Sequence, residues 1–225
     1  MAKVIFAQPF LVGAALAAQC EGRTVVLDLA FNAGSPQGKG TPEEQFAATT
    51  QAFIDGLGEN LVGWLDHHDH KNWPEFAADQ RFTLVPRTQA PACPPIVTPE
   101  WVSSVGEVGT IVAHGDFDGV MSAVKFALGG SEPYDGANAD ALAADTRKGT
   151  LSPVGQRLEE AMKANLADNA MRVAVFDELT TSSVEATAII DAARLKYQAV
   201  QAKTADLAGQ FQISGNAAVL DASKE

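Results

Sequence analysis

The chain has 225 residues, of which 46% are hydrophobic, and its 28 acidic and 16 basic residues give a formal net charge of −12. This length and apolar content suit one folded domain with a small appendage, and they exclude a chain that is disordered over most of its length. The acidic balance argues against a protein that grips long duplex nucleic acid, and no apolar run approaches the about 18 residues of a membrane-spanning helix.

The N-terminal segment has two interpretations. Lys3, the apolar run from Phe10 to Ala18 and the following Ala-Gln-Cys resemble a secretory signal peptide. The same segment also predicts a strand, a helix from Pro9 to Cys20 and a second strand, as in a compact βαβ unit. We favour the second interpretation because Gln8 and Pro9 separate the apolar residues 4–7 from the run that follows, and because a predicted strand comes within a few residues of Cys20. With only two cysteines and no CxxC pair, the sequence then predicts a cytoplasmic protein.

The apolar pattern predicts an α/β fold with an open, mostly parallel twisted sheet flanked by helices. Predicted strands cover 3–7, 24–29, 61–66, 82–85, 110–114 and 172–176, and predicted helices cover 9–20, 41–57, 120–128, 139–145, 152–166 and 184–211. The helix after Thr41 begins with a capping box and ends at Gly58. The Pro-rich stretch 80–99 is expected to be mainly an extended surface loop after its short strand.

The C-terminal quarter predicts a long helix followed by a strand over 215–221. These elements divide the chain into an α/β domain over 1–181, a long helix over 182–212 and a short tail over 213–225. The tail could serve as a subunit contact in a homodimer.

Three predicted strands end in acidic or histidine residues. These are Asp28 after the first, Asp66, His67 and His68 after the second, and His114, Asp116 and Asp118 after the third. Because ligands bind outside the carboxyl ends of strands in an open parallel sheet, we expect these side chains to converge. Crowded carboxylates raise each other's pKa values, and a divalent cation relieves that conflict. Carboxylates with one or two imidazoles suit Mn²⁺, or Mg²⁺ with poorer imidazole affinity.

Each motif alone also fits a structural role. Asp-x-Asp-Gly is a common turn, Asp28 could cap a helix, and the doubled histidine could belong to a solvated loop, as we expect for His70. Three strand ends bearing such groups, in a chain with only four histidines, nevertheless favour a site.

Two segments resemble signatures of the DHH phosphoesterase superfamily over roughly residues 24–150: Leu65-Asp66-His67-His68, and Val112-Ala-His114-Gly-Asp116-Phe-Asp118-Gly119. The strand that ends at Asp28 is similar to the family's lone-aspartate motif. In the family the Asp-x-Asp strand comes first, whereas here it comes last, which suggests a circular permutation. Family members usually carry a smaller second domain after a connecting helix. The resemblance therefore implies that 182–212 is a linker helix and that 213–225 is the start of a truncated or vestigial second domain.

The resemblance implies a two-metal phosphoesterase with two Mn²⁺ ions and a bridging hydroxide, acting on a phosphodiester or phosphoanhydride. A short oligonucleotide or nucleotide-like phosphate fits the acidic exterior better than a duplex does. The implied catalytic residues are His67, His68 and Asp66, and the implied metal ligands are Asp28, Asp116, Asp118, His67, His114 and Asp145. Asp28 would bridge both ions, His68 would contact the substrate phosphate or leaving group, and Asp66 would orient the neighbouring imidazole.

Three candidate residues have alternatives, and Gly119 and Arg147 are the implied substrate-binding residues beside His68. Asp145 is the candidate for the family's fourth acid, or a helix-terminal Asp beside basic residues. His114 lies two residues before Asp116, whereas in many family members the corresponding histidine lies four residues before the aspartate. His114 therefore either binds a cation or hydrogen-bonds to a residue that does. Gly119 is expected to open a helix whose N-terminus favours phosphate. Arg147 and its neighbour Lys148 offer cations for the substrate, or are plain surface charge.

Two other functions stay open. The chain could be a catalytically weak or inactive DHH-like module that binds a nucleotide or metal for regulation or interaction. It could also be a different metallohydrolase in which these motifs occur by coincidence.

Overall fold

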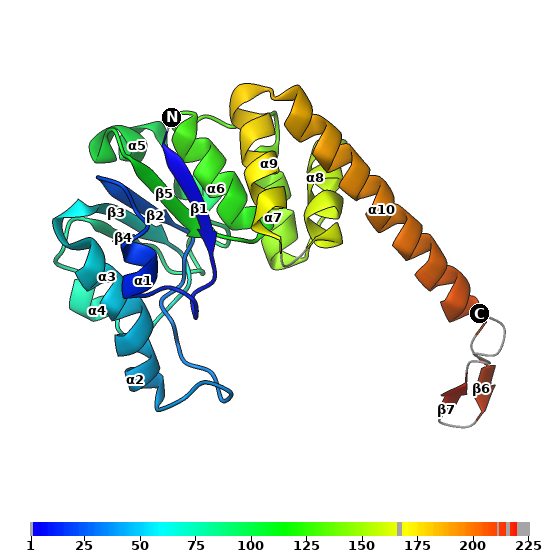
Figure 1. Cartoon of the computed structure of the whole chain (residues 1–225), viewed down its shortest axis with the longest axis horizontal. Coiled ribbons are helices and arrows are strands. Elements are labelled where there is room, and N and C mark those ends of the chain that lie inside the picture. Colours follow the sequence, from blue (N-terminus) through cyan, green and yellow to red (C-terminus); the bar gives the residue numbers. More distant parts are fainter. Residues whose placement is uncertain (1, 166–167, 211, 215–216, 220–225) are drawn as a thin grey trace.

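Five parallel strands form the central sheet in the order β1-β5-β2-β3-β4 (Figure 1). They are β1 (Lys3–Ala7), β2 (Thr24–Leu27), β3 (Leu61–Asp66), β4 (Phe82–Leu84) and β5 (Thr110–His114). The computed structural model describes residues 2–165, 168–210, 212–214 and 217–219. The predicted α/β class, with its parallel sheet and flanking helices, is confirmed.

The N-terminal segment belongs to this sheet, because β1 pairs with β5. It forms an edge strand, because β1 is first in the strand order. No helix in the described part of the chain has both the length and the apolar character needed to cross a membrane.

Both faces of the sheet are covered because its strands are apolar on both sides. Val26, Trp64 and Val112 pack on one face with α1 (Ala14–Ala17), α2 (Pro42–Phe46) and α3 (Ala52–Leu57). Leu27 and Leu65 face the other side, toward α5 (Pro99–Val105), α6 (Phe117–Ala127) and α9 (Asn169–Thr181). The alternation along each strand thus divides the core into two layers.

The predicted helix after Thr41 is confirmed. The Thr41 side chain accepts a hydrogen bond from the Glu44 amide at 3.2 Å, and the Glu44 carboxylate accepts one from the Thr41 amide at 2.8 Å. The helix continues from α2 through a π-helical turn (Ala47–Gln51) into α3, and it ends at Gly58 with a positive φ of 53°. Only glycine adopts such a backbone readily.

Two of the predicted helices and strands are wrong. The helix expected from Pro9 to Cys20 covers only Ala14–Ala17, because a turn closed by a hydrogen bond from the Leu11 amide to the Gln8 carbonyl at 2.8 Å precedes it. The strand expected over 172–176 lies inside α9. A short apolar run does not distinguish a strand from a buried helix, and the helical spacing extends beyond that window to the buried Met171.

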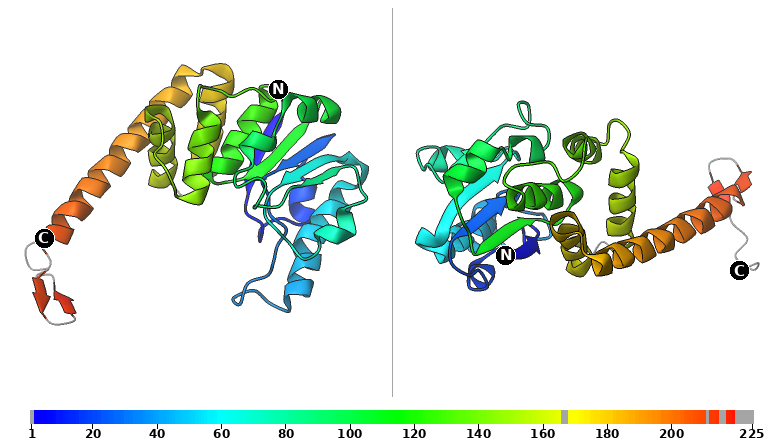
Figure 2. Two further views of the ribbon diagram at one scale, coloured as in Figure 1. Left: turned by 180° about the vertical axis from the view of Figure 1, so that it is seen from behind. Right: turned by 90° about the horizontal axis from the view of Figure 1, so that it is seen from above.

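Four further short or peripheral elements complete the α/β body: α4 (Trp73–Phe76), the 3₁₀ turns Gly58–Asn60 and Pro94–Ile96, and α7 (Ala137–Thr146). Helix α8 (Pro153–Ala164) packs beside α9 and the first part of α10 (Val184–Gly209). The rest of α10 extends away from the sheet (Figures 1 and 2). The predicted helix end at Phe211 lies outside the described residues.

An antiparallel pair follows α10, formed by β6 (Gln212–Ser214) and β7 (Ala217–Val219). The predicted tail strand is therefore confirmed over Ala217–Val219. Its other positions, 215, 216, 220 and 221, lie outside the described residues.

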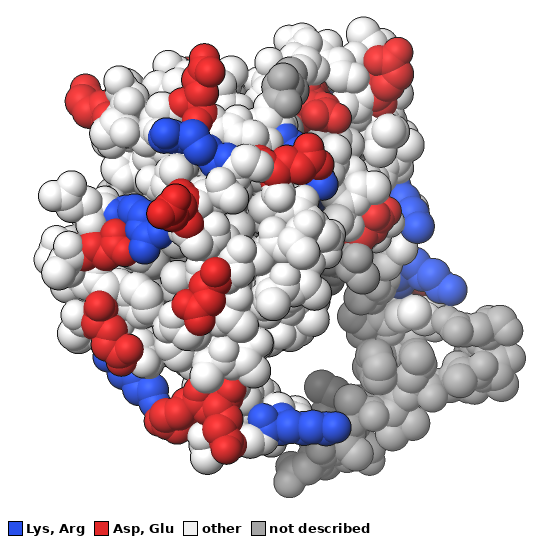
Figure 3. Space-filling model, turned by 60° about the vertical axis from the view of Figure 1, so that its left-hand side comes forward, with Lys and Arg blue, Asp and Glu red and all other residues white. Residues whose placement is uncertain are grey.

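Acidic and basic side chains are interspersed on the face drawn in Figure 3, and the basic ones do not gather into a continuous patch there. This face offers no extended basic surface of the kind that tracks a phosphate backbone.

Arg157 links the three C-terminal helices. Its guanidinium donates to both oxygens of Glu178 on α9, at 2.7 and 3.2 Å, and to Asp191 on α10 at 2.6 Å. We expect Arg157→Met to lower the free energy of unfolding by about 1–3 kcal/mol, because two carboxylates lose charge-assisted hydrogen bonds. Urea unfolding of this variant beside Lys196→Met, an exposed site on α10, measures the effect. Equal stabilities of the two variants would contradict the assigned role.

Candidate functional site

The site lies where the carboxyl ends of β5, β2 and β3 meet, three adjacent strands of the sheet. The chain leaves β2 toward α2 and α3 on one face and leaves β5 toward α6 on the other. Such a reversal opens a crevice at the strand ends, and it is the usual ligand position in open α/β sheets.

Asp28 is the centre of the site. Its side chain is fully buried, and its Oδ1 lies 3.1 Å from His67 Nε2 and 3.8 Å from His68 Nδ1. Its Oδ2 lies 3.9 Å from His114 Nδ1. Neither oxygen receives a well-directed hydrogen bond from a described residue.

The backbone of Asp28 is also unusual, with a φ of 55° in the left-handed region. Aspartate tolerates this region better than most residues, and a strained backbone at about 1–3 kcal/mol is typical of functional sites.

The His67 imidazole is fully buried and has a fixed orientation. Its Nδ1 donates to the Ala90 carbonyl at 2.8 Å, which leaves Nε2 facing Asp28 and, at 3.3 Å, Asp118 Oδ2. The same Asp118 oxygen accepts a hydrogen bond from the Cys93 amide at 3.0 Å. A partner on Nδ1 is how proteins commonly present Nε2 to a metal.

Ala90 and Cys93 belong to the stretch that the sequence predicts to be a surface loop. That prediction is wrong for this part, because Ala90, Ala92, Cys93 and Val97 are buried. We call residues 86–93 the strap. It holds His67 and Asp118 through main-chain groups, so no side-chain pattern in the sequence could reveal these two contacts.

His68 is oriented by Asp66. Its Nδ1 lies 2.8 Å from Asp66 Oδ1, so the imidazole that Asp66 holds is that of His68. The His68 side chain is 22% exposed, whereas His67 is fully buried. His68 is thus the one of the pair that an incoming ligand can reach.

His114 and Asp116 form the opposite side of the site. His114 Nε2 lies 3.0 Å from the Gln8 amide oxygen, and its Nδ1 lies 3.0 Å from Asp116 Oδ2. Gln8 was not among the predicted site residues, because the turn that places it was expected to be helix. The Gln8 amide oxygen accepts a hydrogen bond from His114 Nε2, so His114 Nδ1 faces Asp116 and Asp28.

Gly119 has a different role from the expected one. Its amide donates to Asp116 Oδ1 at 2.9 Å and so caps α6, which leaves that amide unavailable to a phosphate. A Cβ at this position would lie 2.3 Å from the His114 carbonyl oxygen. Glycine is therefore needed here because the helix closely approaches the end of β5.

The acidic and imidazole groups fall into three sets within cation reach. In each set the ligand atoms all lie within 4.8 Å of one another. Two ligands at opposite sides of one cation are separated by about twice the metal–oxygen distance of about 2.0–2.6 Å, so this spacing suits a shared ion. The sets are Asp28, His67 and His68; Asp28, His114 and Asp116; and His67, Asp118 and Asp145. All six predicted metal ligands are therefore brought together, and Asp28 belongs to two sets.

Burial and crowding shift the titration of these groups. Burial, with a further contribution from the charge of Asp118, raises the pKa of Asp28 well above its usual range. Burial likewise raises the pKa of Asp118 to about 6. Burial opposes the charged form of His67, but its contacts with Asp118 and Asp28 raise its pKa to about 11. The metal-free cluster therefore retains protons at neutral pH.

Asp116 behaves in the opposite way. Although burial favours its neutral form, the His114 contact lowers the pKa of Asp116 to about 2. This carboxylate is therefore ionised before any cation arrives.

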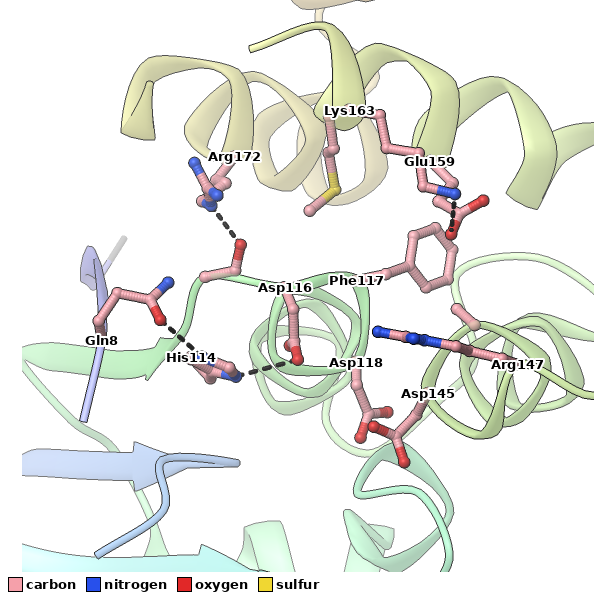
Figure 4. Close-up of a pocket in the computed structure, with 13 residues that line it drawn as sticks. Gln8, His114, Asp116, Phe117, Asp118, Asp145, Arg147, Glu159, Lys163 and Arg172 are labelled. Atoms are coloured by element: carbon pink, nitrogen blue, oxygen red, sulfur yellow. Dashed lines mark hydrogen bonds and ion pairs between the residues drawn. The ribbon is translucent and has the colours of Figure 1, made fainter. Parts of the chain in front are cut away.

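A cavity of about 630 Å³ opens beside Asp116, Asp118 and Asp145. Its opposite wall is α8, which contributes Met162 and the ion-paired Glu159 and Lys163, as Figure 4 shows. The volume is typical of a small-molecule site.

Cationic side chains also line this cavity. Arg147 reaches into it, and Arg172 donates to the Gly115 carbonyl at its edge (Figure 4). Lys148, the other cation that the sequence suggested, is not among the residues that line it.

His70 is not the solvated side chain that the sequence suggested. Its ring stacks on Phe46 with centroids 5.5 Å apart and meets the edge of Phe31. It accepts a hydrogen bond from the Asn72 amide at 3.1 Å. It therefore packs with aromatic residues and belongs to none of the three ligand sets.

Comparison with models of known protein families, with curated proteins and with solved structures found no match for this chain.

We expect Asp28→Asn to leave the metal-free protein equally or more stable, because it removes a buried carboxylate that lacks directed donors. Asparagine also tolerates the positive φ. We expect Mn²⁺ to raise the melting temperature of the wild type and not that of the variant. Thermal unfolding with and without Mn²⁺ measures both effects.

Asp140→Asn is the matched control. Asp140 is also buried, but it accepts hydrogen bonds from the Ser152 amide and hydroxyl at 2.6 Å and from Tyr134 at 3.0 Å. This substitution should lower stability by about 1–3 kcal/mol and leave Mn²⁺ stabilisation intact. An Asp28→Asn variant that is as destabilised as Asp140→Asn would indicate a structural role for Asp28.

Mn²⁺ affinity should rise with pH between about pH 6 and 8. The raised pKa of His67 means that its imidazole is protonated at neutral pH, and a cation that binds this imidazole must displace the proton. Affinity should increase by up to about tenfold per pH unit for each proton released. Calorimetry in buffers of different ionisation enthalpy counts these protons, and a pH-independent affinity would contradict the protonated cluster.

Proposed function

We propose that this protein is a manganese-dependent phosphoesterase that hydrolyses a phosphodiester or phosphoanhydride bond in a small substrate. We also propose that it is a circularly permuted relative of the DHH phosphoesterases. The observation that supports both is the set of carboxylates and imidazoles that converge around Asp28, in which Asp28, His67 and Asp118 are buried and have side-chain atoms without a hydrogen-bond partner among the described residues.

The donor set supports Mn²⁺, with Mg²⁺ as the second choice, because it combines carboxylate oxygens with imidazole nitrogens and has no thiolate among its ligands. Asp28, His114 and Asp116 would hold one cation, and His67, Asp118 and Asp145 would hold the other, with Asp28 shared. Bound cations of this kind would supply activation of water and neutralisation of phosphate charge.

His68 suits proton transfer to the leaving group. Its Nδ1 is engaged by Asp66, so Nε2 is the atom that would donate a proton. Its partial exposure lets a substrate approach, and the Asp66 contact holds the ring in one orientation. Asp66→Asn should therefore lower activity by about 10–100-fold while the fold is retained.

The cavity supports a small substrate. Its volume of about 630 Å³ suits a nucleotide or short oligonucleotide end, and Arg147 at its wall would pair with a phosphate oxygen. The acidic net charge of −12 would disfavour a long duplex. Cys20 and Cys93 are both free, which supports our inference of a cytoplasmic, reducing compartment.

One observation favours the alternative, a catalytically weak or inactive module that binds a nucleotide or metal. Asp145, a member of one ligand set, is ion-paired with Arg87. A permanent pair would leave that set short of a ligand and weaken turnover.

Hydrolysis of bis(p-nitrophenyl) phosphate tests the proposal. We expect release of p-nitrophenol that requires Mn²⁺ and falls to background in Asp116→Ala, because one cation loses a ligand. Lys148→Gln, a charge change outside the cavity lining, is the control and should retain activity. Equal rates for the wild type and Asp116→Ala, or no Mn²⁺ dependence, would contradict the enzymatic proposal.

A further inference from the structure

Arg87 lies on the strap, and the proposed function gives it no role. Its Nη2 forms an ion pair with Asp145 Oδ2. The Arg87 side chain is 44% exposed, whereas that of Asp145 is only 10% exposed. The guanidinium is thus the more exposed partner of the pair, and Asp145 lines the cavity whereas Arg87 is not among its lining residues.

Asp145 belongs to the ligand set that also contains His67 and Asp118. The guanidinium therefore lies at the edge of a cation-sized group and provides a positive charge there. Its pKa is raised by the hydrogen bond with Asp145 and further by the charges of Asp118 and Asp28. Because an arginine does not lose its proton, it yields this carboxylate oxygen to a metal ion only by moving away.

The main chain around Arg87 is anchored, so the movement is confined to the side chain. The Arg87 amide donates to Asp69 Oδ2 at 3.3 Å. The Pro86 carbonyl accepts from the Gln89 and Ala90 amides at 2.7 and 3.0 Å, and the Ala90 carbonyl in turn holds His67. A long exposed side chain on such a base can swing between two partners without disturbing the ligands beneath it.

We propose that Arg87 is a substrate-phosphate-binding residue that Asp145 holds in place until a divalent cation binds. The cation takes the Asp145 carboxylate, and the released guanidinium binds oxygens of the incoming phosphate. The inference rests on the proposed cation site. The planar guanidinium of Arg87 can donate two parallel hydrogen bonds to two phosphate oxygens, which a lysine ammonium cannot match.

This exchange has two consequences of opposite sign. Arg87 competes with the second cation, so its removal strengthens binding of that cation. Arg87 also contributes to phosphate binding, so its removal weakens the phosphate complex. A plain surface ion pair would produce neither effect, because exposed pairs contribute little and touch no ligand.

Calorimetric titration of the full chain tests this with Mn²⁺ first and then with inorganic phosphate on the Mn²⁺-loaded protein. Compared with the wild type, Arg87→Gln should bind the lower-affinity Mn²⁺ ion about fivefold to tenfold more tightly. It should bind phosphate about tenfold more weakly. Arg87→Lys, which keeps the charge, should give an intermediate phosphate affinity.

Arg81→Gln is the matched control, because Arg81 pairs with Asp79 at 2.6 Å with a similar exposure of 38% and lies outside the ligand sets. It should change neither affinity. Circular dichroism melts confirm that each variant is folded.

The outcomes separate the two proposals. A wild type that binds no Mn²⁺ contradicts both the proposed function and the role of Arg87. Two bound Mn²⁺ ions in the wild type, with Arg87→Gln unchanged in both affinities, contradict only the role of Arg87. A loss of Mn²⁺ affinity in Arg87→Gln would also overturn it, because the guanidinium would then support the cation site instead of competing with it.

Discussion

Carboxylates buried beside one another constrain this structure more than any other feature. Asp28, Asp66 and Asp118 are each at most 2% exposed and lie around the same two imidazoles. Burying a carboxylate without full hydrogen bonding is costly, and the cost grows when a second negative charge is near. The metal-free protein relieves part of it with protons on the cluster, as the raised pKa values of Asp28 and His67 indicate. Divalent cations would offset more of this burial cost, and they would give the site the positive charge that binds phosphate.

The surrounding architecture keeps these groups together. Adjacent strands bring three chain segments to one edge, the positive φ of Asp28 places its carboxylate among the imidazoles, and the close approach of Gly119 sets α6 against β5. The strap then fixes His67 and Asp118 through main-chain groups. A protein that needed only a stable core could place apolar residues at these positions, since replacing buried ionic groups by apolar ones is often neutral or stabilising. The retained strain and charge therefore favour a function for this edge.

Much of the fold and the site could be predicted because strand ends leave a strong signal. Apolar runs that end in Asp28, Asp66 and His114 identify both the buried strands and the edge where ligands bind. The contributions of Ala90, Cys93 and Gln8 could not be predicted, because two act through the backbone and the third depends on a turn. The error at 172–176 has a similar cause: the buried face of α9 is set by its packing against α6, which a short sequence window does not contain. Arg87 could not be predicted because it lies in the loop after β4 and carries no strand-end signal, and only the folded chain brings it to Asp145.

The central claim is that the buried edge of the sheet binds two cations that share Asp28. Anomalous diffraction from a crystal of the Mn²⁺-loaded protein tests it most directly, because the peaks locate manganese independently of any activity. The account predicts two peaks a few ångströms apart, one beside Asp28, His114 and Asp116 and the other beside His67, Asp118 and Asp145, with Asp28 in contact with both. Manganese bound only at surface carboxylates, or no peak among these residues at saturating Mn²⁺, would contradict it.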